Sequence, residues 1–143
     1  MGKAGSRTYK LRLSDQGIDL FLACHYRLAQ LLRDFIPYGA TFSVAVALLE
    51  RMDADDIAAE LETHSCLQCA GDKTCFVGSS AELAEIMQLV CERLIESDRF
   101  AQSPPFGKLY IVGLASFRTA EDKDLAEAYR RVAGRGPRRA KKN

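Results

Sequence analysis

The chain has 143 residues, 48% of them apolar and 27% charged, which is typical of one soluble globular domain with a sizeable core. No apolar stretch is long enough to span a bilayer and the first ten residues lack the apolar segment of a signal peptide, so we expect a cytoplasmic protein with no membrane partner. The net charge of +1 conceals an uneven distribution, because residues 13–129 carry nine basic and nineteen acidic residues, whereas the two ends of the chain are basic. Such an acidic body repels a polyanion, and the basic ends attract it.

The chain is expected to begin with a short strand. Residues 1–6 are predicted to be a disordered leader. From Tyr9 to Leu13 apolar and basic residues alternate, which is typical of a half-buried strand with Lys10 and Arg12 on its solvent face.

Helical signals follow this strand. Ser14 is a typical N-cap, and apolar residues recur every three or four positions as far as Ile36, where Pro37 ends the predicted helix. The apolar run 40–49 suits a buried strand or a buried helix equally well. Acidic residues from Asp53 then indicate the start of a short helix.

The second half of the chain shows the same order of elements. Residues 63–72 are predicted to be a polar linker, after which Thr74–Val77 forms a second strand and Ser79 and Ser80 begin a second long helix. Residues 108–117 again suit a strand or a helix. A final helix extends to about residue 133, and the basic tail 134–143 is too polar to fold alone.

These parallels indicate an internal duplication. When the two halves are aligned, Thr8 matches Thr74 near the first strand, and Gly39 matches Gly107 before the apolar run. We therefore predict a mainly α fold with a short β ribbon, in which a duplicated strand-helix-helix unit forms a pseudo-twofold domain. The alternative is an α/β fold with four strands. The predicted parts are a leader (1–6), a first repeat (7–62), a linker (63–72), a second repeat (73–133) and a tail (134–143).

The order of strand, Ser-capped helix, Gly turn and second helix resembles the ribbon-helix-helix family of DNA-binding proteins. The segment YKLRLSDQGIDLF (residues 9–21) carries this resemblance most closely. Two units in one chain resemble the tandem, single-chain members of the family, which include accessory proteins of plasmid transfer and DNA processing. The resemblance implies double-stranded DNA as the partner, with the paired ribbon in the major groove and the N-terminus of the second helix of each unit on phosphates.

The resemblance also implies which residues of this chain contact DNA. Within the second unit, Phe76 and Gly78 occupy ribbon positions where the family has polar residues. In the second helices, the N-terminal positions include Gly39, Ala40 and Thr41. Together with the basic tail, the predicted DNA-contacting residues are Thr8, Lys10, Arg12, Lys73, Thr74, Lys108, Arg135, Arg138, Arg139, Lys141 and Lys142.

Five cysteines allow a metal site. His64, Cys66, Cys69 and Cys75 have the residue types and a C-x-x-C spacing that would suit one structural zinc ion. A redox pair is a second interpretation, and plain thiols are the third. Because the number of cysteines is odd and no export signal precedes them, structural disulfides are not expected.

No catalytic motif is present, and the chain is not expected to be an enzyme. It contains no P-loop, G-x-G-x-x-G, G-x-S-x-G or H-E-x-x-H sequence. Three hypotheses remain: a DNA-binding accessory or regulatory protein, a non-enzymatic assembly module whose acidic helical body binds a larger protein complex, and a small α/β protein that holds a ligand.

Overall fold

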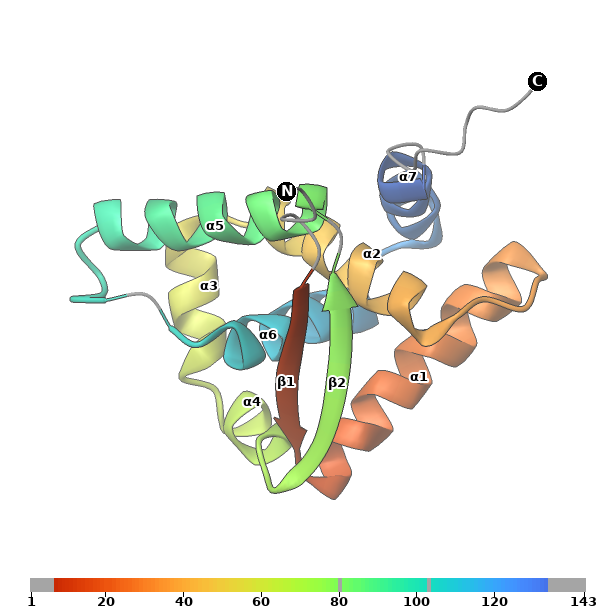
Figure 1. Cartoon of the computed structure of the whole chain (residues 1–143), viewed down its shortest axis with the longest axis horizontal. Coiled ribbons are helices and arrows are strands. Elements are labelled where there is room, and N and C mark those ends of the chain that lie inside the picture. The colour runs from red at the N-terminus through yellow and green to blue at the C-terminus, as the bar shows by residue number, and fades with distance from the viewer. Residues whose placement is uncertain (1–6, 80, 103, 134–143) are drawn as a thin grey trace.

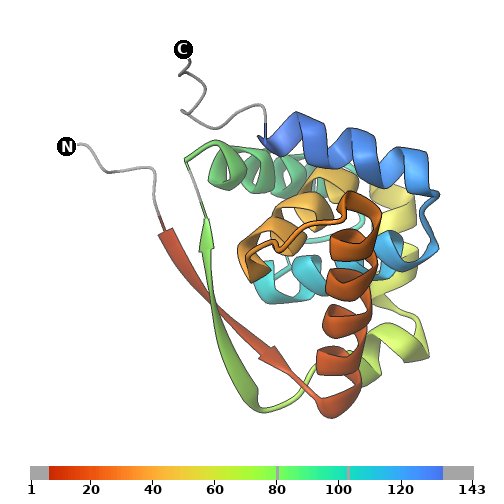
Figure 2. The same ribbon diagram turned by 90° about the vertical axis from the view of Figure 1, so that its right-hand side faces the viewer.

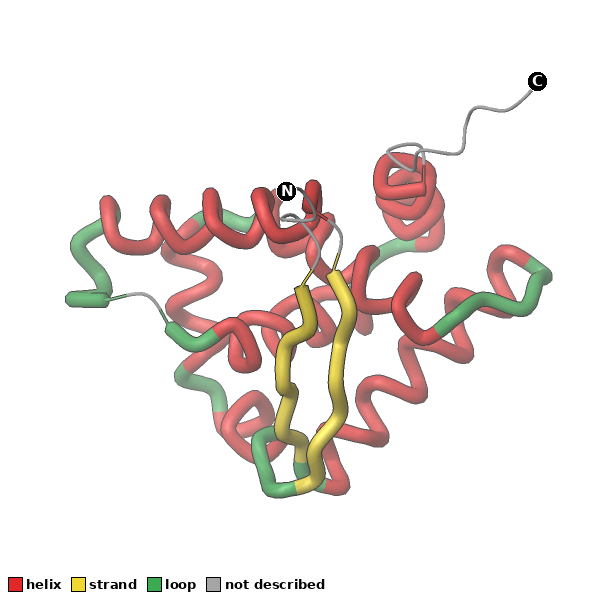
Figure 3. Tube along the Cα trace, viewed as in Figure 1, coloured by secondary structure: helices red, strands yellow, loops and turns green. Residues whose placement is uncertain are grey.

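The computed structural model describes residues 7–79, 81–102 and 104–133 and is mainly helical, with one small sheet (Figures 1 and 3). The elements in chain order are β1 (Arg7–Leu13), α1 (Asp15–Leu32), α2 (Tyr38–Arg51), α3 (Ala54–Leu61), α4 (His64–Cys69), β2 (Lys73–Ser79), α5 (Ala81–Glu96), α6 (Phe106–Thr119) and α7 (Asp122–Ala133). The predicted class, mainly α with a short β ribbon, is confirmed. The predicted leader 1–6 and the predicted tail 134–143 lie outside the described residues.

The two strands come from different halves of the chain and pair antiparallel along their full length. Lys10 lies directly opposite Phe76, and Arg12 lies directly opposite Thr74. The alternation of side chains separates the two faces of this ribbon. One face is buried through Leu11, Leu13 and Val77, and the other is exposed to solvent.

Two central helices, α2 and α6, form the core beneath the ribbon. Both are buried on nearly every side, because the apolar runs 44–49 and 109–112 contain no residue that reaches the surface. The two helices cross in close contact at Gly113, where an added Cβ atom would lie 2.6 Å from the carbonyl oxygen of Ala45. The segments 40–49 and 108–117 lie within α2 and α6 and are helices. The alternative fold with four strands is therefore wrong.

The outer helices pack crosswise on this central pair. The helix α1 packs mainly on α6, and α5 packs on α2, so each long helix contacts the central helix of the other half. The C-terminal helix α7 likewise packs on α2, and α3 packs on α6. Figure 1 shows α1 and α5 on either side of the ribbon, with α6 passing behind β1.

One arginine from each half holds the end of a central helix. Arg27 of α1 donates hydrogen bonds to the carbonyl oxygens of Phe117 (3.1 Å) and Arg118 (3.3 Å) at the end of α6. Arg93 of α5 donates to the carbonyl oxygen of Glu50 (3.0 Å) at the end of α2. Each arginine satisfies carbonyl groups that have no partner within the helix.

Two local predictions require correction. The first long helix ends at Leu32 and not at Ile36, because Arg33 takes a left-handed conformation (φ 56°) and its N–H closes the helix. Phe35 consequently lies outside the helix and is fully exposed. The segment 63–72, predicted to be a plain linker, contains the short helix α4, which Thr63 caps by accepting a hydrogen bond from the N–H of Cys66 (3.1 Å). No helix in the described ranges has both the length and the apolar character needed to cross a membrane.

Candidate nucleic-acid interface

The solvent face of the ribbon is the most accessible regular surface formed by the predicted DNA-contacting residues. Lys10, Arg12, Thr74 and Phe76 are all exposed on this face, in two rows that run side by side. Figure 2 shows the ribbon at one edge of the molecule, with the helices on its other side. A two-stranded ribbon of this kind fits the width of the DNA major groove.

The N-terminus of α6 lies beside the middle of β1. An added Cβ atom at Gly107 would lie 3.6 Å from Cδ1 of the buried Leu11 and 3.8 Å from the carbonyl oxygen of Lys10, so this helix end packs on the buried side of β1; the next residue, Lys108, is exposed. The helix starts after Pro105, and the N–H of Lys108 bonds to the carbonyl oxygen of Pro105 (3.0 Å). The positive end of the α6 dipole is therefore at the end of the helix that contacts β1.

The N-terminus of α2 is built in the same way but differs in which residues are accessible. It follows Pro37, and Gly39 is exposed. Thr41, expected on the DNA side, is fully buried, and its Oγ1 lies 2.7 Å from Nδ1 of His25. Thr41 thus orients α1 on α2 and is not accessible to a phosphate.

The remaining predicted DNA contacts have different surroundings. Lys73 lies opposite the buried Leu13, so it is on the other face of the ribbon from Lys10, and its ammonium pairs with the Asp15 carboxylate (3.1 Å). Thr8 of β1 lies opposite Gly78 of β2. The tail residues Arg135, Arg138, Arg139, Lys141 and Lys142 lie outside the described residues.

Helix α4 holds the end of the ribbon, a role that the sequence reasoning missed. The Ser14 N–H donates to the carbonyl oxygen of Cys69 (2.8 Å), and the Ser14 hydroxyl donates to that of Gln68. Gly71 must be glycine for this contact, because an added Cβ would lie 2.5 Å from the Cα of Ser14. The contact fixes the junction between β1 and α1.

The four predicted metal ligands have unequal surroundings. Cys66 and Cys69 are buried in α4, whereas His64 and Cys75 are exposed. Within the described part of the chain, no group of three or more Cys, His, Asp or Glu residues is arranged to hold a metal ion.

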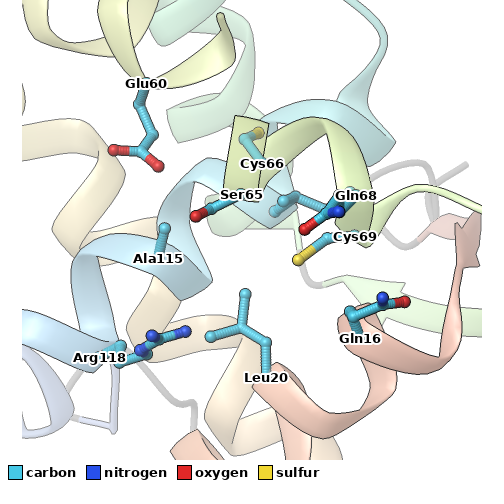
Figure 4. Close-up of a pocket in the computed structure, with 10 residues that line it drawn as sticks. Gln16, Leu20, Glu60, Ser65, Cys66, Gln68, Cys69, Ala115 and Arg118 are labelled. Atoms are coloured by element: carbon cyan, nitrogen blue, oxygen red, sulfur yellow. The ribbon is translucent and has the colours of Figure 1, made fainter. Parts of the chain in front are cut away.

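A small pocket adjoins α4. It measures about 160 Å³ and is lined by residues of α1, α3, α4 and α6, including Glu60, Cys66, Cys69 and Arg118. In Figure 4 the sulfur atoms of Cys66 and Cys69 point in different directions. The volume is below the range of about 300 to 1,000 Å³ that is usual for ligand pockets, so this pocket is too small for a typical small-molecule ligand.

Thiol labelling should distinguish the cysteines sharply. Burial raises the pKa of Cys24 to about 12 and the pKa of Cys66 to about 11, and only the thiolate attacks a maleimide. We expect the exposed Cys75 to react first, with Cys24 and Cys66 largely unmodified in the folded protein. At pH values below its pKa, the rate of Cys66 labelling should rise about tenfold for each unit by which the pH is raised. Peptide mass spectrometry would measure this rate. Equal rates at Cys66 and Cys75 would contradict the buried position of α4.

No protein-family model, no curated protein and no solved structure matches this chain.

Proposed function

We propose that this protein is a DNA-binding accessory or regulatory protein that inserts the solvent face of its ribbon into the major groove. The observation that supports this most strongly is the ribbon itself. It has one face buried on the core and one free face, which carries the exposed Lys10 and Arg12, and it lies at one edge of the molecule (Figure 2). This face of the two paired strands is cationic and contacts no other element in the described part of the molecule. It is therefore suited to bind DNA, a polyanion whose major groove has a matching width.

We further propose that the domain is a tandem ribbon-helix-helix pseudo-dimer. The lengths of its elements support this, because β1 and β2 have seven residues each and α2 and α6 have fourteen each. The alignment that matches Thr8 with Thr74 also matches the start of β1 with that of β2, and the start of α1 with that of α5. The alignment that matches Gly39 with Gly107 also matches the start of α2 with that of α6, and the start of α3 with that of α7.

Contacts between equivalent positions also support the duplication. Ala45 and Gly113 are matched in the same alignment as Gly39 and Gly107, and they touch one another, as residues near a twofold axis do. Arg27 and Arg93 are matched in the alignment of the strands and long helices, and they hold the ends of opposite central helices.

The charge distribution favours this face over the rest of the surface. The body of the chain is strongly acidic, whereas Lys10 and Arg12 both lie exposed on the solvent face of β1. An acidic body repels phosphates, so DNA would be guided to the cationic ribbon and would bind in one orientation. The basic tail would add contacts to phosphates, which strengthen binding without reading sequence.

Titration of a labelled random duplex across a salt series tests the proposal. With about four phosphate contacts, the affinity should fall about a hundredfold between 50 and 200 mM salt, because bound cations are released from the DNA. Fluorescence anisotropy would measure this change. Absence of binding at about 50 mM salt would contradict the proposal.

A second candidate function, assembly with a protein partner, is favoured by one observation. Large apolar side chains are exposed on α1, on the segment that follows it and at the start of α2: Leu22 (45% exposed), Tyr26 (66%), Phe35 (101%) and Tyr38 (60%). A protein complex formed through this surface would persist at high salt, since apolar burial is not screened by ions. Sedimentation at low and high salt would separate this function from DNA binding.

A further inference from the structure

We propose that the two strands of the ribbon read different bases, guanine from β1 and the thymine methyl group from β2, so that the preferred DNA site is not palindromic. This inference rests on the proposed DNA-binding function and specifies its target. It concerns the solvent face of the ribbon, where Lys10 and Arg12 of β1 lie opposite Phe76 and Thr74 of β2.

The register places the two kinds of side chain next to each other at the centre of the ribbon. Lys10 and Phe76 are directly opposite, and both are exposed, Phe76 by 67%. Directly opposite residues of an antiparallel pair lie on the same face, so both side chains point away from the core. An apolar ring in the middle of a free, cationic face has no role in the packing of this chain.

The chemistry of the major groove assigns a different target to each strand. The cations Lys10 and Arg12 match the two acceptors of guanine, N7 and O6. The ring of Phe76 can neither donate a conventional hydrogen bond nor accept one well, and the apolar feature that the groove presents to it is the C5 methyl group of thymine. Gly78, the next residue of β2 on this face, adds no side chain.

The asymmetry has a direct consequence for the DNA site. A ribbon made of two identical strands presents the same residues to both half-sites, so its target is a palindrome. In the proposed alignment of the two halves, Lys10 is equivalent to Phe76 and Arg12 is equivalent to Gly78. The proposed pseudo-dimer therefore presents two unlike strands, and the half-site under β1 should differ from the half-site under β2.

Selection of binding sites from a random duplex library tests the inference with the full chain. We expect an enriched site that is not palindromic and that contains a thymine near its centre. Replacement of that thymine by deoxyuridine removes the methyl group alone and should weaken wild-type binding about fourfold, which corresponds to the burial of one methyl group. The same replacement should not weaken binding of Phe76→Ala.

A second variant makes the ribbon more symmetric. Phe76→Lys places lysine on both strands at the centre, and its selected site should lose the thymine and become palindromic at the central positions. Because Phe76 is exposed, both variants should fold, which circular dichroism and the melting temperature would verify.

The outcomes separate this inference from the proposed function. If the wild-type protein binds DNA with the expected salt dependence but selects a palindrome, selects no sequence, or is indifferent to deoxyuridine at every thymine, the inference is overturned and the function stands. If the protein binds no duplex at low salt, both are overturned.

Discussion

Replacement of Lys10 and Arg12 together by alanine is expected to weaken binding to duplex DNA at least tenfold at moderate salt. Both side chains lie exposed on the solvent face of β1, and neither supports the buried face beneath it. Without these two cations, binding of the protein also releases fewer counterions from the DNA. The slope of log affinity against log salt should therefore become shallower by up to about 1.8, which anisotropy titrations would measure.

A matched control variant loses two positive charges as well, but near the end of α6 that is far from β1. Arg118 and Lys123 are exposed, and α6 carries its C-terminus about 21 Å from the end that adjoins β1, as expected for fourteen helical residues. Arg118→Ala with Lys123→Ala should change the affinity less than threefold. Equal losses for the two double variants would show that net charge and not the ribbon governs binding, and an unchanged affinity of the ribbon variant would remove the ribbon from the mechanism.

Gly113→Val is expected to lower the free energy of unfolding by about 3 kcal/mol or more, which equilibrium denaturation in urea would measure. A Cβ atom at position 113 would lie 2.6 Å from the carbonyl oxygen of Ala45 and 3.2 Å from its Cβ. The first of these neighbours is backbone in the centre of α2, so it cannot turn aside as a flexible side chain would. The central helices would have to separate along a contact that is buried on all sides.

Gly39→Val is the appropriate control, because Gly39 also lies in a central helix but no atom would contact an added Cβ within 4 Å. Its free energy of unfolding should stay within about 0.5 kcal/mol of the wild-type value. Gly113→Ala should fall between the two, since alanine relieves the low helix propensity of glycine by about 1 kcal/mol while its Cβ still clashes. A stable Gly113→Val protein would contradict the close crossing of α2 and α6.

The parts of the fold that could be predicted from sequence are those with local signals. The alternation in β1 indicates which of its faces is buried, and the hydroxyl of Ser14 does accept the N–H of Gly17 at the start of α1 (3.1 Å). These signals work because a strand or an amphipathic helix with one buried face repeats its apolar residues with the period of its backbone.

The central helices could not be recognised in this way. A helix that is apolar on all sides has no wet face, so the runs 40–49 and 108–117 carry no periodicity that separates helix from strand. Both runs are helices in the structure, and their packing on each other and on the outer helices consists of contacts that no local pattern encodes. The position of α4 was missed for a related reason, because the partner of its last turn, Ser14, lies in the first half of the chain, far from α4 in sequence.

The exposure of the candidate DNA-contacting residues was predicted in part. Lys10 and Arg12 are on the solvent face, as the alternation indicates, whereas Thr41 is buried against His25 and Lys73 is paired with Asp15 on the other face. Burial of a hydroxyl or pairing of an ammonium depends on residues that are distant in sequence. Residue type and spacing alone therefore overestimate how many polar side chains remain free.

The sequence by itself determined the local elements: the short strands, the caps and the recurrence of one order of elements in both halves. It also determined the acidic body and the basic ends, since charge is a property of composition. Only the tertiary structure decided that β1 pairs with β2 so that Lys10 faces Phe76, and that α2 crosses α6 at Gly113. Both are contacts between residues from opposite halves of the chain, and their geometry depends on how the whole core packs.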